Sequence, residues 1–170
     1  MLTEIAKAAQ GIAGKIEGAD EIGKVENNNA GAADAGSVNG IAQGMKAIVE
    51  AAKKGGVELK DTGDGGAANG NAGKVFAGGA AGDADAADKA AAAVSKASGE
   101  QILNAIVETA DGDKEGKKAS DAQNPIDAAI GTADDAAAFH NNMQKNAKVA
   151  AAIVLRGMAK NGKFALGGDN

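Results

Sequence analysis

Residues 149–160, VAAAIVLRGMAK, constrain the fold more than any other part of the chain, because they would form a helix that is apolar on nearly every side. Only Arg156 and Lys160, four residues apart, make a narrow charged strip along it. A helix with apolar residues all round is normally buried among other elements. The segment therefore predicts a central helix over about residues 143–160. A peptide-binding or membrane-surface helix is the alternative, but the apolar coverage is too wide for an interfacial stripe.

Three smaller features refine this expectation. Arg156 and Lys160 can keep their charged ends in water while their aliphatic stems cover apolar surface. Gly157 would form a notch that lets a neighbouring helix approach closely, at a cost of about 1 kcal/mol in helix propensity. Gly162, which follows Asn161, is expected to end the helix in a left-handed C-terminal cap.

The rest of the chain predicts short helices separated by long loops. Alanine favours the helix and glycine disfavours it, and the chain holds 26 Gly, 3 Phe and no Trp or Tyr. Strands prefer β-branched and aromatic residues, which are sparse. Hydrophobic periodicity predicts helices over 2–16, 37–54, 86–97 and from 98 onward, with another after 124. We expect an all-α fold, a bundle of short Ala-rich helices and Gly-, Asp- and Asn-rich loops with little or no β-structure.

Helix-capping residues support these boundaries. Ser37 is expected to cap the helix that runs to residue 54. Ser98 and Gln101 match the capping box, in which a hydroxyl and a side-chain amide satisfy two backbone N–H groups reciprocally. Asn124 is a good N-cap, and Pro125 after it suits the first helical position.

The apolar positions of these helices predict the core. Its expected members are Ile41, Met45, Ile48, Ile102, Leu103, Ile106, Ile126, Ile130, Ile153, Val154, Leu155, Met158 and Phe164. Phe76 and Phe139 are expected to anchor two of the loops. A buried Leu or Ile contributes roughly 1.5–3 kcal/mol and alanine much less, so we expect modest stability.

An acidic turn at residues 111–116, DGDKEG, half-matches a calcium-binding loop. An EF-hand loop needs a bidentate glutamate at its twelfth position, where this chain has Ala122. The favoured interpretation is a solvated acidic turn. The Gly-rich stretch at 63–73 likewise lacks the spacing of a phosphate-binding loop, because Gly73-Lys74 is followed by valine instead of serine or threonine.

No side chains are arranged for catalysis. His140 is the single histidine and lies in a loop, whereas a catalytic histidine needs a nucleophile or an orienting carboxylate. Asp134 and Asp135 read as surface charge. We expect no catalytic residue, cofactor or metal. The net charge of −5 argues against nucleic acid as a partner.

Several long strings resemble one family. They are GSVNGIAQGMKAIVEAA at 36–52, AGKVFAG at 72–78, SGEQILNAIVETADG at 98–112, GKKASDAQNPIDAAIGT at 116–132 and LRGMAKNGKFAL at 155–166. In this order they resemble the variable major surface lipoproteins of Borrelia spirochaetes. That family includes the variable large proteins of relapsing-fever species and the Vmp-like protein of Lyme species.

The resemblance implies a function. The family is mostly α-helical, exported, lipidated and displayed on the outer membrane, and it is not enzymatic. It evades host antibodies by switching or recombining exposed segments between framework segments. The segments at 23–35, 57–71, 79–90, 111–123 and 132–146 would be the variable loops that antibodies meet. The implied partners are host antibodies and, through a lipid anchor outside this chain, the outer membrane. A homodimer is also compatible with the resemblance.

The resemblance also implies a domain organisation. Against the full-length pattern, residues 1–170 would form a single partial domain that lacks the signal and lipid-anchor region and the C-terminal helices. A surface module that binds a host ligand or a complement regulator is the alternative function. Interface hot spots favour Trp, Tyr and Arg. This chain has no Trp, no Tyr and a single Arg, which argues against such a module.

Overall fold

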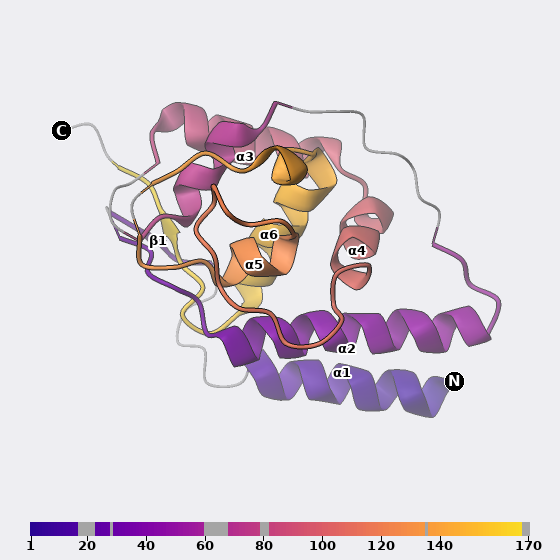
Figure 1. The fold of residues 1–170 in the computed structure, drawn as a ribbon. Helices are drawn as coiled ribbons and strands as arrows, with labels where there is room; N and C mark the ends of the chain where they lie inside the picture. Colours follow the sequence, from indigo (N-terminus) through magenta and orange to yellow (C-terminus); the bar gives the residue numbers. More distant parts are fainter. Residues whose placement is uncertain (17–22, 28, 60–67, 79–81, 135, 168–170) are drawn as a thin grey trace.

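A computed structural model describes residues 1–16, 23–27, 29–59, 68–78, 82–134 and 136–167. The described residues form a helical fold with one very small sheet, as predicted (Figure 1). The α-helices are α1 (Leu2–Ile16), α2 (Ala35–Lys54), α3 (Ala84–Lys96), α4 (Gly99–Val107), α5 (Pro125–Ile130) and α6 (Asn146–Met158). The 3-10 helices are η1 (Gly70–Phe76) and η2 (Asn141–Met143), and the strands are β1 (Val25–Glu26) and β2 (Phe164–Ala165).

Helix α6 is central, as the apolar segment predicted. It contacts α2, α3, α4 and α5, while α1 and α2 lie side by side as a long pair along one edge of the molecule (Figure 1). A Cβ atom at Gly44 of α2 would lie 2.3 Å from the Ile12 side chain, so glycine lets this pair approach closely. Among the described residues, no helix is long and apolar enough to cross a membrane.

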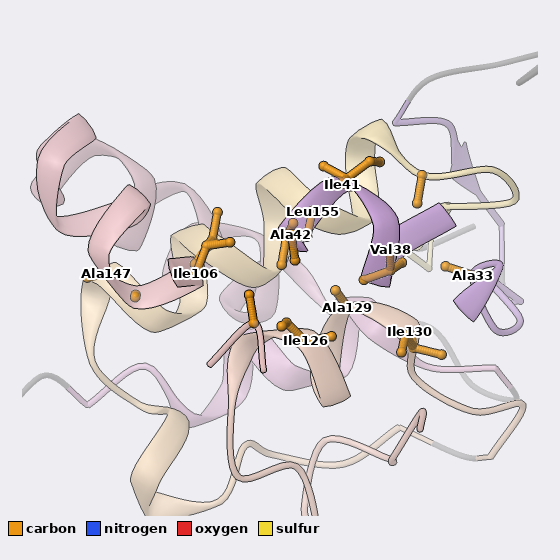
Figure 2. Packing of buried hydrophobic residues seen from close by; sticks show 14 residues of the cluster. Ala33, Val38, Ile41, Ala42, Ile106, Ile126, Ala129, Ile130, Ala147 and Leu155 are labelled. Carbon is orange, nitrogen blue, oxygen red and sulfur yellow. The ribbon is translucent and has the colours of Figure 1, made fainter. Parts of the chain in front are cut away.

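Two hydrophobic clusters lie on different faces of α6. The first joins α2, α4, α5 and α6 through Val38, Ile41, Ile106, Ile126 and Leu155 (Figure 2). The second joins η1, α3, α6 and the loops before α5 and α6, and its large members are Val75, Phe76, Phe139, Met143 and Val149. Phe76 and Phe139 are therefore loop anchors, with ring centroids 5.2 Å apart.

The structure divides the expected core residues into two groups. Ile41, Ile106, Ile126, Ile130 and Leu155 are buried. The others are only half-buried: Met45, Ile48, Ile102, Leu103, Ile153, Val154, Met158 and Phe164. Helix α6 is buried mostly through alanine, since Ala150, Ala151 and Ala152 are fully inaccessible. The small residues face the neighbouring helices and let them approach, so the bulkier Ile153 and Val154 lie partly at the surface.

Helix α4 begins with a complete capping box. The Ser98 hydroxyl accepts a hydrogen bond from the backbone N–H of Gln101, and the Gln101 side chain accepts one from the Ser98 N–H. At α5, the Asn124 side chain accepts from the N–H groups of Ile126 and Asp127, with Pro125 in the first turn.

Ser37 does not cap α2, and this prediction was wrong. The helix begins at Ala35, and the Asp34 carboxylate caps it by accepting the N–H of Ser37 at 2.7 Å. Aspartate caps as well as serine does, and Asp34 lies three residues before Ser37, the predicted start. The buried Ser37 hydroxyl instead donates to the carbonyl of Lys15 and accepts the N–H of Lys160, which ties α1, α2 and the end of α6 together.

Gly162 is not the left-handed residue after α6. The helix ends at Met158, and Asn161 adopts the positive φ of 58°. A Cβ atom at Gly162 would lie 1.6 Å from the carbonyl oxygen of Arg156, so close approach is what requires glycine there. The notch expected at Gly157 was also wrong, because a Cβ atom there would meet nothing closer than the Phe164 ring at 3.8 Å.

The small sheet joins distant parts of the chain. Strands β1 and β2 are parallel, with Val25 opposite Phe164, and Gly82 bridges to Leu166 beyond them. Ala165 is the buried residue of β2, while Phe164 and Leu166 are half-buried on the same side. The segment after α6 is therefore fixed by two loops that precede it in sequence.

Leu155→Ala should lower the free energy of unfolding by about 2–5 kcal/mol, because Leu155 is fully buried where the helices meet. Ile153→Ala is the matched control on the half-buried face and should cost about half as much. Urea unfolding of both variants checks this. Equal losses would contradict the division between the two faces.

Candidate functional site

The Arg156 side chain is fully buried, so the prediction that it lies in water was wrong. Its Nε donates to the carbonyl of Lys163 and its Nη2 to the carbonyl of Gly31. Its Nη1 donates to the carbonyls of Ala129, at 3.0 Å, and Ile130, at 3.2 Å. One helix side chain thus binds the backbone of the loop before α2, the end of α5 and the segment before β2.

Backbone carbonyls stabilise this buried charge, and among the described residues no carboxylate pairs with it. The guanidinium carbon also lies 5.6 Å from the centre of the Phe76 ring, within the range of a cation–π contact. Burial lowers the pKa of Arg156 to about 10, so the group remains charged at neutral pH. The planar fork of five N–H donors suits several carbonyls at once.

The Asn39 side chain binds the backbone of a second loop. This α2 side chain is 5% exposed, and its Nδ2 donates to the carbonyl of Lys114 at 2.9 Å. The N–H of Lys114 donates back to the Asn39 Oδ1, also at 2.9 Å. The Asn39 side-chain amide therefore pairs with the N–H and the carbonyl of Lys114. The side chain of Lys114 takes no part in these two bonds.

Asn69 holds a third segment. It is 6% exposed, and its Nδ2 donates to the Gln144 carbonyl at 3.1 Å and to the Asn146 Oδ1 at 2.8 Å. Buried polar groups need such partners, because an unpaired one costs roughly 1–3 kcal/mol. Asn69 thereby joins the start of η1 to the start of α6.

The loops also bind one another through peptide groups. The pairs are Ala30 N–H to Ala77 carbonyl, Ala33 to Ile130, Gly78 to Asp134, Phe139 to Gly70 and His140 to Ala119, with nitrogen–oxygen distances of 2.8 to 3.1 Å. These bonds satisfy loop backbone where it passes over the core. The contacts that place the loops are thus largely independent of loop side chains.

Three ion pairs at the surface add charge contacts. Lys46 pairs with Asp111, Lys163 with Glu26 at 3.0 Å and Lys74 with Asp83 at 3.2 Å. Hydrogen bonds from Lys163 and Lys24 lower the pKa of Glu26. The pKa of Asp83 is lowered mainly by a hydrogen bond from the N–H of Ala86 and next by one from Lys74. A hydrogen bond from Lys46 lowers the pKa of Asp111.

The acidic turn is not gathered around an ion. Its Asp111 binds Lys46 and its Asp113 accepts from the Gln43 side chain, so both carboxylates hold the turn on α2. In the described part of the chain, no three metal-binding side chains converge. Of the Asp134–Asp135 pair, Asp134 accepts from the Thr132 hydroxyl, and Asp135 lies outside the described residues.

His140 and Gly73 have structural roles. The His140 Nδ1 accepts the N–H of Asn142 and caps η2, and its side chain is exposed. A Cβ atom at Gly73 would lie 2.6 Å from the backbone of Ala137 and Phe139, so this glycine serves loop packing.

An apolar groove of about 400 Å³ lies between α3 and the small sheet. Its walls include Val25, Val75, Val94, Ile153, Phe164 and Leu166. Among the described residues that line it, none carries a charge, so they offer no acid, base or cation to a substrate.

The fold and its contacts define a helical framework that holds surface loops by their backbones. The sequence profile of the family described as Borrelia lipoprotein matches residues 1–170, and the chain belongs to that family.

Among curated relatives, the chain is 36% identical over 155 residues to variable large protein 25 of Borrelia hermsii, which covers 86% of this chain and 42% of that protein. It is 33% identical over 169 residues to variable large protein 12 of the same species, covering 96% and 45%. The chain thus spans less than half the length of these relatives.

A solved structure matches closely: the Lyme disease variable surface antigen VlsE of Borrelia burgdorferi. The TM-score is 0.89 at 48% identity, over 98% of this chain and 58% of that one. The family resemblance seen in the sequence is confirmed by the lipoprotein family profile, by the variable large proteins and by the variable surface antigen VlsE.

Sequence reasoning missed the loop-binding side chains Arg156, Asn39 and Asn69. A usable signal existed, because Arg156 is the only arginine of the chain and lies among the apolar residues 149–159, and Asn39 lies among the apolar positions of α2. What the sequence does not show is which backbone each one meets.

Arg156→Met should lower the free energy of unfolding by more than about 3 kcal/mol, because four carbonyls lose their donor inside the protein. Arg156→Lys should not restore the loss, since one ammonium cannot reach all four oxygens. Lys160→Met is the control and should cost about 1 kcal/mol or less. Chemical denaturation measures all three, and a stable Arg156→Met variant would contradict the assignment.

Acid should destabilise the sheet end of the molecule. The folded pKa of Glu26 is below its ordinary value of 4.5, so its contribution is present above that pH and is lost as pH falls through the folded pKa. Glu26→Gln and Lys163→Met should each make unfolding midpoints fall less steeply between about pH 4.5 and 2.5. Slopes equal to that of the parent protein would refute this role.

Proposed function

We propose that this chain is the loop-bearing framework of an antigenically variable surface lipoprotein. Replacement of its exposed loops by switching or recombination would change the surface that host antibodies bind, while the framework keeps the fold. The proposal includes display on the outer membrane through a lipid anchor, which the family description as a lipoprotein supports.

The observation that carries the proposal is the way in which framework side chains bind the loops. Arg156 binds the carbonyl of residue 31, and Asn39 binds both peptide groups of residue 114. Every residue has a carbonyl, and every residue except proline has an N–H group. At residue 114 the loop side chain can therefore change without breaking these bonds, whereas the φ of 62° at residue 31 favours glycine there.

The structure narrows the segments expected to vary. Residues 84–90 belong to α3, and residues 70 and 71 belong to η1. Among the described residues of the remaining segments, six apolar ones are buried: Ala30, Ala33, Ala119, Ala122, Phe139 and Met143. The positions proposed to vary are therefore the exposed ones between these anchors, such as Glu115, Lys118 and Asp121.

Stability measurements test the framework part of the proposal. Lys114→Ala should change the free energy of unfolding by less than about 0.5 kcal/mol, because the bonds to Asn39 use the backbone. Asn39→Ala should cost about 1–3 kcal/mol, because it leaves the peptide groups of residue 114 unpaired. Amide hydrogen exchange at residue 114 should accelerate only in Asn39→Ala. A larger loss of stability in Lys114→Ala than in Asn39→Ala would contradict the framework part of the proposal.

Antibody binding tests the functional part. Sera raised against the folded chain should bind the triple variant Glu115→Ala, Lys118→Ala, Asp121→Ala less tightly by about tenfold or more, since interface hot spots cost at least 2 kcal/mol. The control is Lys7→Ala, Glu50→Ala, Lys53→Ala on the exposed faces of α1 and α2. Equal effects of the two triple variants would count against variable loops as the antibody-facing surface.

A further inference from the structure

We propose that strand β1 is the contact surface of a weak homodimer, in which the edges of two copies of the chain pair antiparallel about Val25. The dimer is independent of the proposed function. It assigns a second copy of the chain as the partner of one strand edge and of the apolar groove beside that strand.

The outer edge of β1 can accept a further strand. Among the described residues, β1 pairs with one strand, β2, and lies at the left of the molecule in Figure 1. The carbonyl of Lys24 accepts the N–H of Phe164 at 2.8 Å. The carbonyl of Glu26 accepts the N–H of Leu166 at 3.1 Å, so both carbonyls face β2.

The backbone groups of Val25 point the other way, because successive residues of a strand direct their backbone groups to alternate sides. Within the described part of the chain, neither the N–H nor the carbonyl of Val25 has a hydrogen-bond partner. A strand edge with such groups is a template for pairing with another chain.

The sequence of this edge, Lys24-Val25-Glu26, is complementary to itself. In an antiparallel pair centred on Val25, this residue exchanges both N–H···O bonds with the same residue of the second copy. Lys24 of each copy then lies opposite Glu26 of the other. Oppositely charged residues at facing positions stabilise a strand pair. A two-fold interface requires this match of a surface with itself, so the edge fits a second copy of the chain.

The two charged side chains are accessible for this contact. They lie together on one face of β1, where the Lys24 Nζ is 3.3 Å from a Glu26 carboxylate oxygen. Their side chains are 39% and 30% exposed. Lys163 binds the same carboxylate at 3.0 Å, so a second copy would place each glutamate among lysines of both chains.

The same pairing would cover apolar surface. Side chains alternate along a strand, and Val25 lies on the face that lines the groove, with Phe164, Leu166 and Val94. Val25 is 54% and Val94 41% exposed, two of five large apolar side chains that stay exposed among the described residues. The two-fold axis of an antiparallel pair is perpendicular to the sheet, so the grooves of both copies would adjoin on one side. Removing this surface from water favours association.

The dimer should be weak, because two backbone hydrogen bonds and a small apolar contact fall short of the roughly 1,200–2,000 Å² that a stable interface buries. We expect a dissociation constant on the order of 0.1 mM. Sedimentation equilibrium and amide NMR spectra of the whole chain, recorded over about 0.02–1 mM, measure it. The amide resonance of Val25 should shift with concentration, because its N–H gains a hydrogen bond.

Charge reversals at the edge test the arrangement. Lys24→Glu and Glu26→Lys each put like charges opposite one another and should weaken self-association by about tenfold or more. An equimolar mixture of the two variants should associate as the parent chain does, because each glutamate again faces a lysine. Lys7→Glu on the exposed side of α1 carries the same charge change and is the control.

Val25→Pro tests the backbone bonds. Proline has no N–H and is tolerated on edge strands, and the bonds from the carbonyls of Lys24 and Glu26 to β2 remain. Both bonds of the two-fold pair lose their donor, so self-association should weaken by about tenfold or more. Thermal unfolding of each variant is measured alongside, and recovery in the mixture of charge variants requires that both are folded.

A chain that stays monomeric over the whole concentration range would overturn the dimer and leave the proposed function standing. Association that neither Lys24→Glu nor Val25→Pro weakens would also overturn it, since the copies would then meet at another surface. The free peptide GKVEN, residues 23–27, serves as a probe of the edge. A shift of the Val25 resonance with this peptide, without association of whole copies, would assign the edge to another extended partner and overturn the dimer as well.

Discussion

The buried guanidinium of Arg156 is the interaction on which the rest of the arrangement depends. It gathers four carbonyls from three segments that lie far apart in sequence, and it does so from the centre of the fold. A buried charge is costly unless it is fully hydrogen-bonded. The segments that supply those oxygens cannot move away independently, so the end of α5, the loop before α2 and the approach to β2 are fixed together.

Small residues allow the helices to pack around α6 although the chain has few large apolar side chains. Ala150, Ala151 and Ala152 let helices pack closely against α6 on two sides, and each side then needs only a few isoleucines, leucines or phenylalanines. Close packing of small groups gives many dispersion contacts in place of bulk. The core is thin but continuous, and the loops reach into it with single anchors such as Phe139.

Local features were predictable from the sequence. The bounds of α1, the capping box at Ser98 and the Asn124–Pro125 start follow from residues close together in the chain. Contacts between distant residues were not predictable. The burial of Arg156 depends on carbonyls of residues 31, 129 and 130, and a carbonyl has no signature in sequence. Gly162 was misassigned for the same reason, because the oxygen that excludes its Cβ belongs to the preceding helix.

In the candidate site, too, local features were predictable and contacts between distant residues were not. The alternation of helices and polar loops, and the resemblance of the framework strings, indicated where the loops lie. Phe139 was predicted as a loop anchor, but which loop alanines and glycines face inward could not be predicted, because both residue types also occur at the surface. Ala119 and Ala138 look alike in sequence, yet one is buried and the other is exposed.

The bonds at residues 114 to 117 have a consequence for chain length. Asn39 fixes residue 114, Gly116 packs on Gly131, and the N–H of Lys117 donates to the carbonyl of Asp127. An inserted or deleted residue between these points would put every following peptide group out of register. Exchange of sequence in this stretch must therefore conserve the number of residues and the glycine at 116, even where it changes the other side chains. Codon-by-codon replacement fits the fold here, and changes in length belong elsewhere on the surface.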